Sequence, residues 1–301
     1  MNFTWLEDFL ALAATGNFSR AADQRHSSQP AFSRRIRALE EWIGVPLVDR
    51  STQPARLTDA GEWLRTVAED LVSRAARLPG DARQVAEAGS VTLRIASTHA
   101  LSFTFLPRWL LGLESTSKLG PVELTSDVLE RCEAQMQQGQ VHFVLAHAHP
   151  KMRGALDSNE YLWTKIGSDQ LVAVSKPRPD RQPLHDLETP AAATIAILAY
   201  TEESGLGRII RSVLAQRLEH LPAQVAFTAH LASVLRSMAL DGRGVTWLPR
   251  SLIQDDLEAG RLVVAGTDLW HIDLDIHLYR ARGLVNRTAT SIWDSVTADK
   301  D

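Results

Sequence analysis

Two stretches of the first sixty residues place apolar side chains at helical spacing, which predicts helices over about 5–13 and 29–43. Between them, Ser19 can cap a second helix over 20–25, which the tract 26–28 ends. Gly16 and Gly44 are suited to end the first and the third, since glycine adopts the left-handed conformation at a helix end without strain. In the third helix the apolar positions follow at steps of four, three and four, and they form one stripe. The stripe consists of Phe32, Ile36, Leu39 and Ile43.

The opposite side of the third predicted helix is polar. Arginine, serine and glutamine occupy its N-terminal half, and Pro30 stands in its first turn after Ser28, a good capping residue. Side chains of these types clamp phosphates and contact base edges. As far as charge alone goes, the pattern fits a DNA-reading helix and a solvated basic helix equally well.

A wing is predicted directly after these helices. Residues 45–48 form an apolar run typical of a short strand, residues 49–56 are polar, and Leu57 returns to apolar character before the capping residue Thr58. Strand, polar loop and return together make a wing. The wing residues that could reach a phosphate or the minor groove are Arg50, Thr52, Gln53 and Arg56.

Residues 59–88 have the pattern of one long helix. Its apolar positions repeat at steps of three and four, which is close to a seam for a partner helix. Packing on the chain's own core would produce the same pattern. Pro79 and Gly80 are expected to kink or stop this helix. The seam consists of Ala60, Leu64, Val67, Leu71, Ala75 and Leu78.

From residue 90 onward, short apolar runs alternate with helical stretches, which is typical of α/β sheets. Two sets of elements indicate two lobes, one over about 91–166 with a return of 268–301, and one over about 168–265. The expected fold is therefore mixed, with a winged helix-turn-helix, a long helix and a two-lobed α/β domain. The expected strands are 91–96, 122–125, 141–146, 170–175, 193–199, 223–227, 245–248, 262–264 and 273–279, and the expected helices are 101–113, 129–137, 206–218, 231–240 and 289–296.

Composition and charge are those of an ordinary folded protein, with 45% apolar and 23% charged residues among 301. The net charge of −4 argues mildly against nucleic-acid binding, but residues 19–37 hold five arginines and one acid, so positive charge is local. Cys132 is the one cysteine of the sequence, which precludes an intramolecular disulfide. Neither a membrane span nor a secretion signal is present, so a cytoplasmic protein is expected.

Polar residues follow several predicted strands, at the end where open α/β sheets bind ligands. Residues 97–102 open a helix whose free N–H groups can hold an anion, residues 146–149 follow the third strand, and residues 201–208 open a helix of the second lobe. A loop that only caps its helix would explain each segment singly. As a set they predict a site for a small effector, for which an anion is one candidate. The expected effector-site residues are Ser97, Thr98, His99, Ala100, Ser102, His147, Glu203, Ser204 and Thr246.

Metal binding and catalysis are weaker interpretations of the same region. His99, His147 and His149 could approach one cleft, and imidazoles bind zinc. No nearby carboxylate or cysteine completes a ligand set, so polar lining is the better explanation, and neither a metal nor a cofactor is expected. The sequence has no G-x-S-x-G, no H-E-x-x-H and no glycine-rich phosphate loop followed by lysine. An enzyme is therefore not expected, although an enzyme built on the α/β part is the competing class.

Four runs in the N-terminal part are notable for their order and spacing. They are FSRAA at 18–22, SQPAFSRRIRALE at 28–40, GVPL at 44–47 and LTDAG at 57–61. Together they resemble the signature of LysR-type transcription regulators, with VDR at 48–50 in place of the usual Leu-Phe-x-Arg. A weaker likeness, GRGVTWLP at 242–249, extends to the effector domain of that family, which is similar to periplasmic binding proteins.

The resemblance implies a DNA-binding domain over 1–60, a linker helix over 59–89 that dimerises with its twin, and an effector-binding domain over 90–301. It implies binding to an interrupted palindrome in double-stranded DNA as a dimer or tetramer. Base contacts would come from Gln29, Pro30, Ser33 and Arg34. Contacts to the DNA backbone, or the register of the module, would come from Ser28, Arg35, Arg37, Arg50 and Thr58, and Gln53 of the wing completes the expected DNA-binding set.

A narrower resemblance points to the hypochlorite-responsive branch of the family. It rests on the run at 28–40, HALS at 99–102, GRII at 207–210 and ALDGRGVTWLP at 239–249. That branch is thought to sense through methionine oxidation, which makes an apolar thioether polar. Here Leu206 and Leu231 stand where its methionines are expected, and the chain has only four methionines. A ligand-controlled regulator is thus the main hypothesis, and sensing by side-chain oxidation is the alternative.

Overall fold

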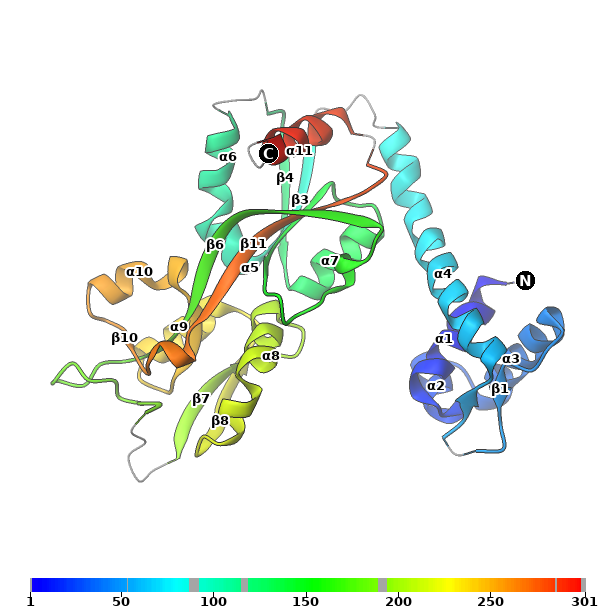
Figure 1. Cartoon of the computed structure of the whole chain (residues 1–301), viewed down its shortest axis with the longest axis horizontal. Helices are drawn as coiled ribbons and strands as arrows, with labels where there is room; N and C mark the ends of the chain where they lie inside the picture. Colours follow the sequence, from blue (N-terminus) through cyan, green and yellow to red (C-terminus); the bar gives the residue numbers. More distant parts are fainter. Residues whose placement is uncertain are drawn as a thin grey trace. The chain divides into compact units, whose positions relative to one another are not determined.

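The structure, a computed structural model, describes residues 2–52, 54–86, 92–114, 119–188, 194–284 and 286–298. It divides into two compact units, Met1–Pro79 and Gly80–Asp301, called here the head and the body. The long helix α4, Asp59–Ala86, begins in the head and ends in the body (Figure 1). Gln53 of the predicted wing lies outside the described residues.

Three packed helices and a small hairpin form the head, as the sequence predicts. Asn2 and Asn17 cap the first two helices with their side chains, and Gly16 and Gly44 end the first and third with φ of 60° and 87°. The apolar stripe of the third helix is buried against the other two. The elements are α1 (Phe3–Thr15), α2 (Phe18–Gln24), α3 (Gln29–Ile43), β1 (Val48–Asp49) and β2 (Arg56–Leu57).

The wing hairpin is shorter than predicted. The strand expected over 45–48 begins only at Val48, and the two strands pair through Val48 with Leu57 and Asp49 with Arg56. Ser28 stands at the N-cap of α3 but forms no capping hydrogen bond with its side chain. The Thr58 hydroxyl donates to Pro46 O at 2.9 Å and accepts from Gly61 N at 3.1 Å, which fixes the return of the wing to α4.

Helix α4 does not stop at Pro79, contrary to that part of the expectation, and continues to Ala86. Proline deletes one N–H donor from a helix interior, and α4 carries on past this loss. Leu64 and Leu71 of the predicted seam pack on the core of the head, so the alternative of internal packing holds for the first half of the seam. Leu78, at 65% exposure, and Val85, at 68%, face outward.

The main sheet of the body has strands in the order β10-β6-β11-β5-β3-β4, with β9 also paired to β6. Strand β3 runs parallel to β4 and β5, and the remaining pairs are antiparallel. The strands are β3 (Leu93–Thr98), β4 (Val122–Asp127), β5 (Phe143–Ala148), β6 (Tyr161–Ser175), β9 (Thr246–Pro249), β10 (Val263–Val264) and β11 (Ile272–Ala281).

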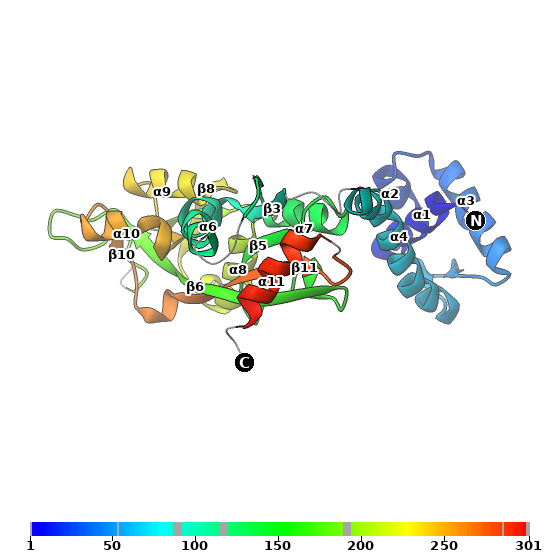
Figure 2. The same cartoon turned by 90° about the horizontal axis from the view of Figure 1, so that it is seen from above.

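Alternation along the central strands places helices on both faces of this sheet (Figure 2). On one face, Ile95 and Phe143 pack with α6 (Leu106–Glu114) and α11 (Arg287–Ala298). On the other, Val144 and Ala146 pack with α7 (Leu129–Gln137). The single helix expected over 101–113 is two helices, α5 (His99–Thr104) and α6, which Phe105 separates. One-turn 3₁₀ segments follow at η1 (Ala155–Asp157) and η2 (Asp268–Trp270).

A second, two-stranded parallel sheet completes the body. It consists of β7 (Ile195–Tyr200) and β8 (Ala223–Ala229), joined through α8 (Gly205–Glu219) and followed by α9 (Ala232–Leu240). An isolated bridge between Ile197 and Val245 ties this sheet to the chain just before β9.

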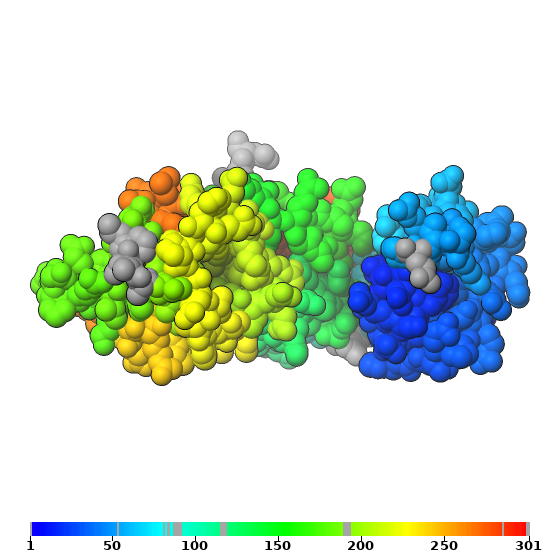
Figure 3. Space-filling view, turned by 90° about the horizontal axis from the view of Figure 1, so that it is seen from below, coloured from blue at the N-terminus to red at the C-terminus, as the bar shows by residue number. Residues whose placement is uncertain are grey.

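The body is two-lobed, because β6 and β11 each contribute to two separate cores. The first lobe holds the core around β3, β5, α6 and α11, to which Ile276 and Leu278 belong. The second lobe holds the core around β7, β9, α8 and α9, to which Leu171 and Leu274 belong. The two lobes abut at the surface, where the yellow α8 and α9 region meets the green segment of the first lobe (Figure 3).

Two elements of the body escape prediction. The first half of β6, residues 161–169, is strand, whereas the sequence analysis places a strand only over 170–175. Helix α10, Arg250–Glu258, follows Pro249 with no side-chain cap. Helix α10 has apolar residues at helical spacing, Leu252, Ile253 and Leu257, which pack on the core of the second lobe, so its pattern was available in the sequence.

Candidate nucleic-acid interface and ligand cavity

A groove of about 580 Å³ lies between α2, α3 and the wing of the head. It brings together Gln29, Ser33, Arg37 and Arg50 of the expected DNA-binding set. Ser28, Pro30 and Arg34 are exposed on the same N-terminal half of α3 without lining the groove. The other lining residues are Gly16, Asn17, Phe18, Ser19, Thr52, Pro54 and Ala55.

Arg35 has an inward contact that the sequence does not reveal. Its guanidinium pairs with Asp8, whose carboxylate is fully buried on α1. Arg25, at the end of α2, donates to the same carboxylate at 3.0 Å and also pairs with Glu7. The contact ties α3 to α1 within the head.

Arg50 is held at the start of the wing. Its guanidinium lies 2.6 Å from a Glu40 carboxylate oxygen and 5.6 Å from the centre of the Phe18 ring. The other Glu40 oxygen accepts from the backbone N–H groups of Leu47 and Val48 at 3.0 and 3.2 Å. Glu40 thereby fixes the wing to the third helix, and the Arg50 side chain, which lines the groove, stays 36% exposed.

A cavity lies between the two lobes of the body, where helices of both lobes begin. Its volume of about 30 Å³ accommodates one or two water-sized groups. Thr98, His99, Ala100, His147 and Ser204 of the expected effector site line it. Its further lining residues, which the sequence analysis missed, are Asp127, Val128, Leu129, Gly205, Leu206, His230 and Ala232.

The other four expected effector residues do not line this cavity. Ser97 and Thr246 are fully buried in their strands, and Ser102 is buried on α5, where its hydroxyl lies 2.9 Å from Ser126 Oγ. Glu203 is exposed on the loop before α8. Strand alternation explains Ser97, because it points to the face opposite that of Thr98, its neighbour in the cavity.

Four helices direct their N-terminal ends at the cavity: α5, α7, α8 and α9. Free N–H groups and helix dipoles make such ends electropositive. Ser204 caps α8 by accepting from Gly207 N at 3.4 Å, whereas α5, α7 and α9 have no side-chain cap. Thr98 Oγ1 is a buried atom without a hydrogen-bond partner among the described residues. The cavity is thus rich in donors.

Histidines from both lobes add polar groups to the cavity wall. His99 Nδ1 lies 3.0 Å from Ser126 Oγ, and its ring centre lies 6.0 Å from that of His230 in the second lobe. Burial lowers the pKa of His99, and His230 adds to this effect against the opposing influence of Asp127. His147 Nε2 lies 3.5 Å from the buried Asp169 carboxylate.

Metal binding has no support in the described part of the chain. His149 is not among the cavity residues, and its Nδ1 accepts from Lys151 N at 3.1 Å. Within the described ranges, no group of three or more His, Cys, Asp or Glu side chains is arranged to hold a metal ion. The described helices likewise include none that is long and apolar enough to cross a membrane.

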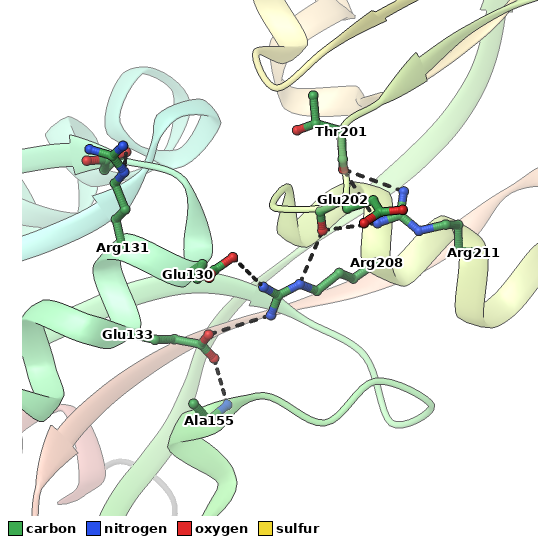
Figure 4. A network of polar contacts seen from close by, with 9 residues as sticks. Glu130, Arg131, Glu133, Ala155, Thr201, Glu202, Arg208 and Arg211 are labelled. Atoms are coloured by element: carbon green, nitrogen blue, oxygen red, sulfur yellow. Dashed lines mark hydrogen bonds and ion pairs between the residues drawn. The ribbon is translucent and has the colours of Figure 1, made fainter. Parts of the chain in front are cut away.

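Ion pairs connect the two lobes beside the cavity (Figure 4). Arg208 of α8 lies 3.3 Å from Glu130 and 3.6 Å from Glu133, both on α7. The side chain of Glu133 is 7% exposed, and its other oxygen accepts from Ala155 N at 2.9 Å. Burial raises the pKa of Glu133, although Ala155 N–H and Arg208 act against this rise.

A helical head with a polar recognition face and a two-lobed α/β body with a cavity between its lobes define a ligand-responsive DNA-binding protein. Comparison with known proteins agrees. Residues 3–62 match the model of the bacterial regulatory helix-turn-helix proteins of the lysR family, and residues 86–299 match that of the LysR substrate binding domain. The chain therefore belongs to the LysR family, and it is a DNA-binding transcription regulator with an effector-binding domain.

Individual relatives cover almost the whole chain. The HTH-type transcriptional regulator YjiE of Escherichia coli K12 is 30% identical over 297 residues, which are 96% of this chain and 92% of YjiE. The full-length structure of the hypochlorite-specific regulator HypT from Salmonella typhimurium is 27% identical, with a TM-score of 0.59 over 99% and 98% of the two chains. The structure of Vibrio fischeri DarR in complex with DNA is 25% identical, with a TM-score of 0.57 over 98% of each chain.

Proposed function

We propose that the head reads DNA through the exposed N-terminal half of α3 and through the wing. The observation that carries this proposal is the groove in which Gln29, Ser33, Arg37 and Arg50 lie together. Exposed Arg34 would pair with a guanine edge, since its guanidinium has no partner among the described residues and presents two parallel donors. We propose that Ser28, Pro30 and Thr58 either contact DNA or hold the head in position on it. Gln53 is included because it belongs to the wing.

Footprinting on the DNA upstream of the chain's own gene, at two salt concentrations, tests this proposal. A protected two-part site with a steep salt dependence is the expected result. Arg34→Ala is expected to weaken binding by about 1–3 kcal/mol and to relax the preference at one base step. Unchanged affinity together with unchanged sequence preference would exclude Arg34 as a base contact.

We propose further that two or more chains associate through α4 and so hold an interrupted palindrome. Leu78 and Val85 support this, because they are exposed, apolar and seven residues apart on one helix. Trp63 on the same helix is 63% exposed. Sedimentation equilibrium of Leu78→Asp is expected to shift the mass toward the single chain, and an unchanged mass would place the interface elsewhere.

For the body we propose a small anionic effector in the cavity between the lobes. The convergence of four helix N-termini supports an anion. Such a ligand acts by its difference in affinity for separated and closed lobes. The protein would work in the cytoplasm, where chromosomal DNA lies, as a binder and not as an enzyme. Thermal shifts with a panel of small carboxylates and inorganic anions test this, and no stabilisation by any anion, with stabilisation by a cationic ligand, would contradict it.

A further inference from the structure

The first turns of α7 and α8 contact each other across the gap between the lobes. A Cβ added to Gly205 would lie 2.9 Å from Leu129 Cδ2, so the missing side chain of Gly205 allows this close approach. Leu129 and Gly205 both line the cavity. Any force that holds these two helix starts together therefore also holds the two walls of the cavity together.

Arg208 supplies such a force from the second lobe. Its guanidinium reaches Glu130 at 3.3 Å and Glu133 at 3.6 Å on α7 of the first lobe (Figure 4). These three side chains are called here the α7–α8 clasp. The clasp carries two negative charges against one positive charge, and it lies within one turn of the cavity residues on both helices.

Both ends of the clasp are fixed within their own lobes. In the first lobe, Glu133 accepts from Ala155 N, and a Cβ on Gly154 would lie 2.4 Å from the same Glu133 oxygen, so backbone encloses the carboxylate. In the second lobe, Arg208 Nε donates to Glu202 O at 3.5 Å, and Arg211 donates to the carbonyls of 200–202. When the lobes close, the Glu133 carboxylate and the Arg208 guanidinium therefore lose little side-chain freedom.

Glu133 makes closure conditional on Arg208. A carboxylate that is 7% exposed has lost most of its water, and an unpaired buried charge is strongly unfavourable. In a state with separated lobes, Glu133 would stay with Ala155 while Arg208 would leave with α8, and water would replace the guanidinium more fully than in the closed state. Removal of the guanidinium therefore penalises the closed state and leaves the open state unaffected.

We propose that Arg208 is a positioning residue that holds the lobes closed over the cavity before any effector binds, with Glu133 as its main partner. The inference rests on the proposed function of the cavity as the effector site. It assigns to the clasp the setting of the equilibrium between open and closed lobes. An effector then adds its own contacts to a state that the clasp already favours, and the clasp tunes the concentration at which it acts.

Thiol labelling measures this equilibrium directly, without effector or DNA. Ala232 is 6% exposed, lines the cavity and differs from cysteine by one sulfur atom, so Ala232→Cys in a Cys132→Ser background is labelled only when the lobes part. Arg208→Gln, which leaves the buried Glu133 charge unpaired, is expected to accelerate labelling on the order of 5- to 30-fold. Glu133→Gln removes that buried charge together with the ion pair and is expected to accelerate labelling less, because Arg208 is 30% exposed and keeps Glu130 as a partner. Arg208→Lys is expected to restore part of the protection.

The controls separate lobe opening from loss of structure. Arg217→Gln changes an exposed arginine of the same helix and is expected to leave the rate unaltered. In chains that keep Cys132 as the one thiol, buried in the core of the first lobe, Arg208→Gln is expected not to accelerate labelling. The variant with both Gln substitutions is expected to label no faster than the quicker single variant.

Three results would overturn the proposal: unchanged labelling in both single variants, multiplied effects in the double variant, or equal acceleration at Cys132. Each is independent of DNA. A protein that fails to protect DNA but passes this test would refute the proposed DNA contacts and leave the clasp standing. If the labelling test fails while the protein still protects its DNA site, only the proposed role of the clasp is refuted.

Discussion

Replacement of Asp8 by asparagine tests how the head holds its recognition helix. The Asp8 carboxylate is fully buried, and it receives Arg25 from the end of α2 and Arg35 from α3, so one side chain of α1 joins all three helices. Loss of one partner from a fully buried ion pair costs about 3–5 kcal/mol. The arginine side chains are 32% and 29% exposed, so water offsets part of that loss, and about 2 kcal/mol remains.

Calorimetry of the full chain measures this effect, because the head and the body are separate compact units. For a unit of 60–100 residues, about 2 kcal/mol lowers Tm by roughly 8–16 °C. The transition of the head, identified by its response to DNA, is expected to fall by this amount in Asp8→Asn while that of the body stays. Asp23→Asn, an exposed acid of α2, serves as the control with a negligible shift. A head transition that moves no further than in the control would refute the reasoning.

Three further predictions concern single residues. Gly61→Ala is expected to destabilise the head by more than about 2 kcal/mol and to abolish DNA protection, because its Cβ would lie 2.1 Å from Leu47 O. Gly112→Ala, inside α6 of the body and with no neighbouring atom within 4 Å of its Cβ, is the control: it is expected to leave the head transition in place and to raise that of the body slightly. Burial raises the pKa of Cys132 to about 12, so iodoacetamide at pH 7.5 should alkylate the native chain far more slowly than the urea-unfolded chain, and equal rates would contradict this burial. Although burial raises the pKa of Asp256, its arginine partners lower it further, to below the usual value. The ionised Asp256 carboxylate therefore stabilises the fold above about pH 4, and this contribution is lost as the pH falls through the depressed pKa. The urea midpoint of Asp256→Asn is expected to lie below that of the parent protein at pH 7 and to approach it near pH 3. A difference in midpoint that does not change with pH would contradict the depressed pKa.

The elements that the sequence predicts well are those with strong apolar contrast. Helix α7 has the predicted bounds of 129–137, because Leu129, Cys132 and Met136 repeat on one buried face. The first half of β6 was missed, since it is a crossover strand whose place in the sheet depends on β11. Pairing between strands more than 100 residues apart leaves no local trace in one sequence.

Most polar residues of the cavity follow a strand or open a helix, and the sequence analysis found only some of them. Thr98, His147 and Ser204 were identified because each follows a predicted strand or opens a helix. Asp127 ends β4 and His230 follows β8, so the same reasoning would have included both. The clasp was beyond such reasoning, because Arg208 and Glu133 meet only through the packing of two lobes.

The structure divides the clustered arginines of the head into an inward set and an outward set. Five arginines between residues 19 and 37 suggested a basic surface. Arg25 and Arg35 are occupied by Asp8, which leaves Arg20, Arg34 and Arg37 exposed on this stretch. The clustered charge therefore serves two purposes, since one part locks the helices together and the other part faces outward. A phosphate contact requires a guanidinium with free donors, so the outward arginines set the electrostatic part of DNA affinity, and the inward pair sets how rigidly α3 is presented.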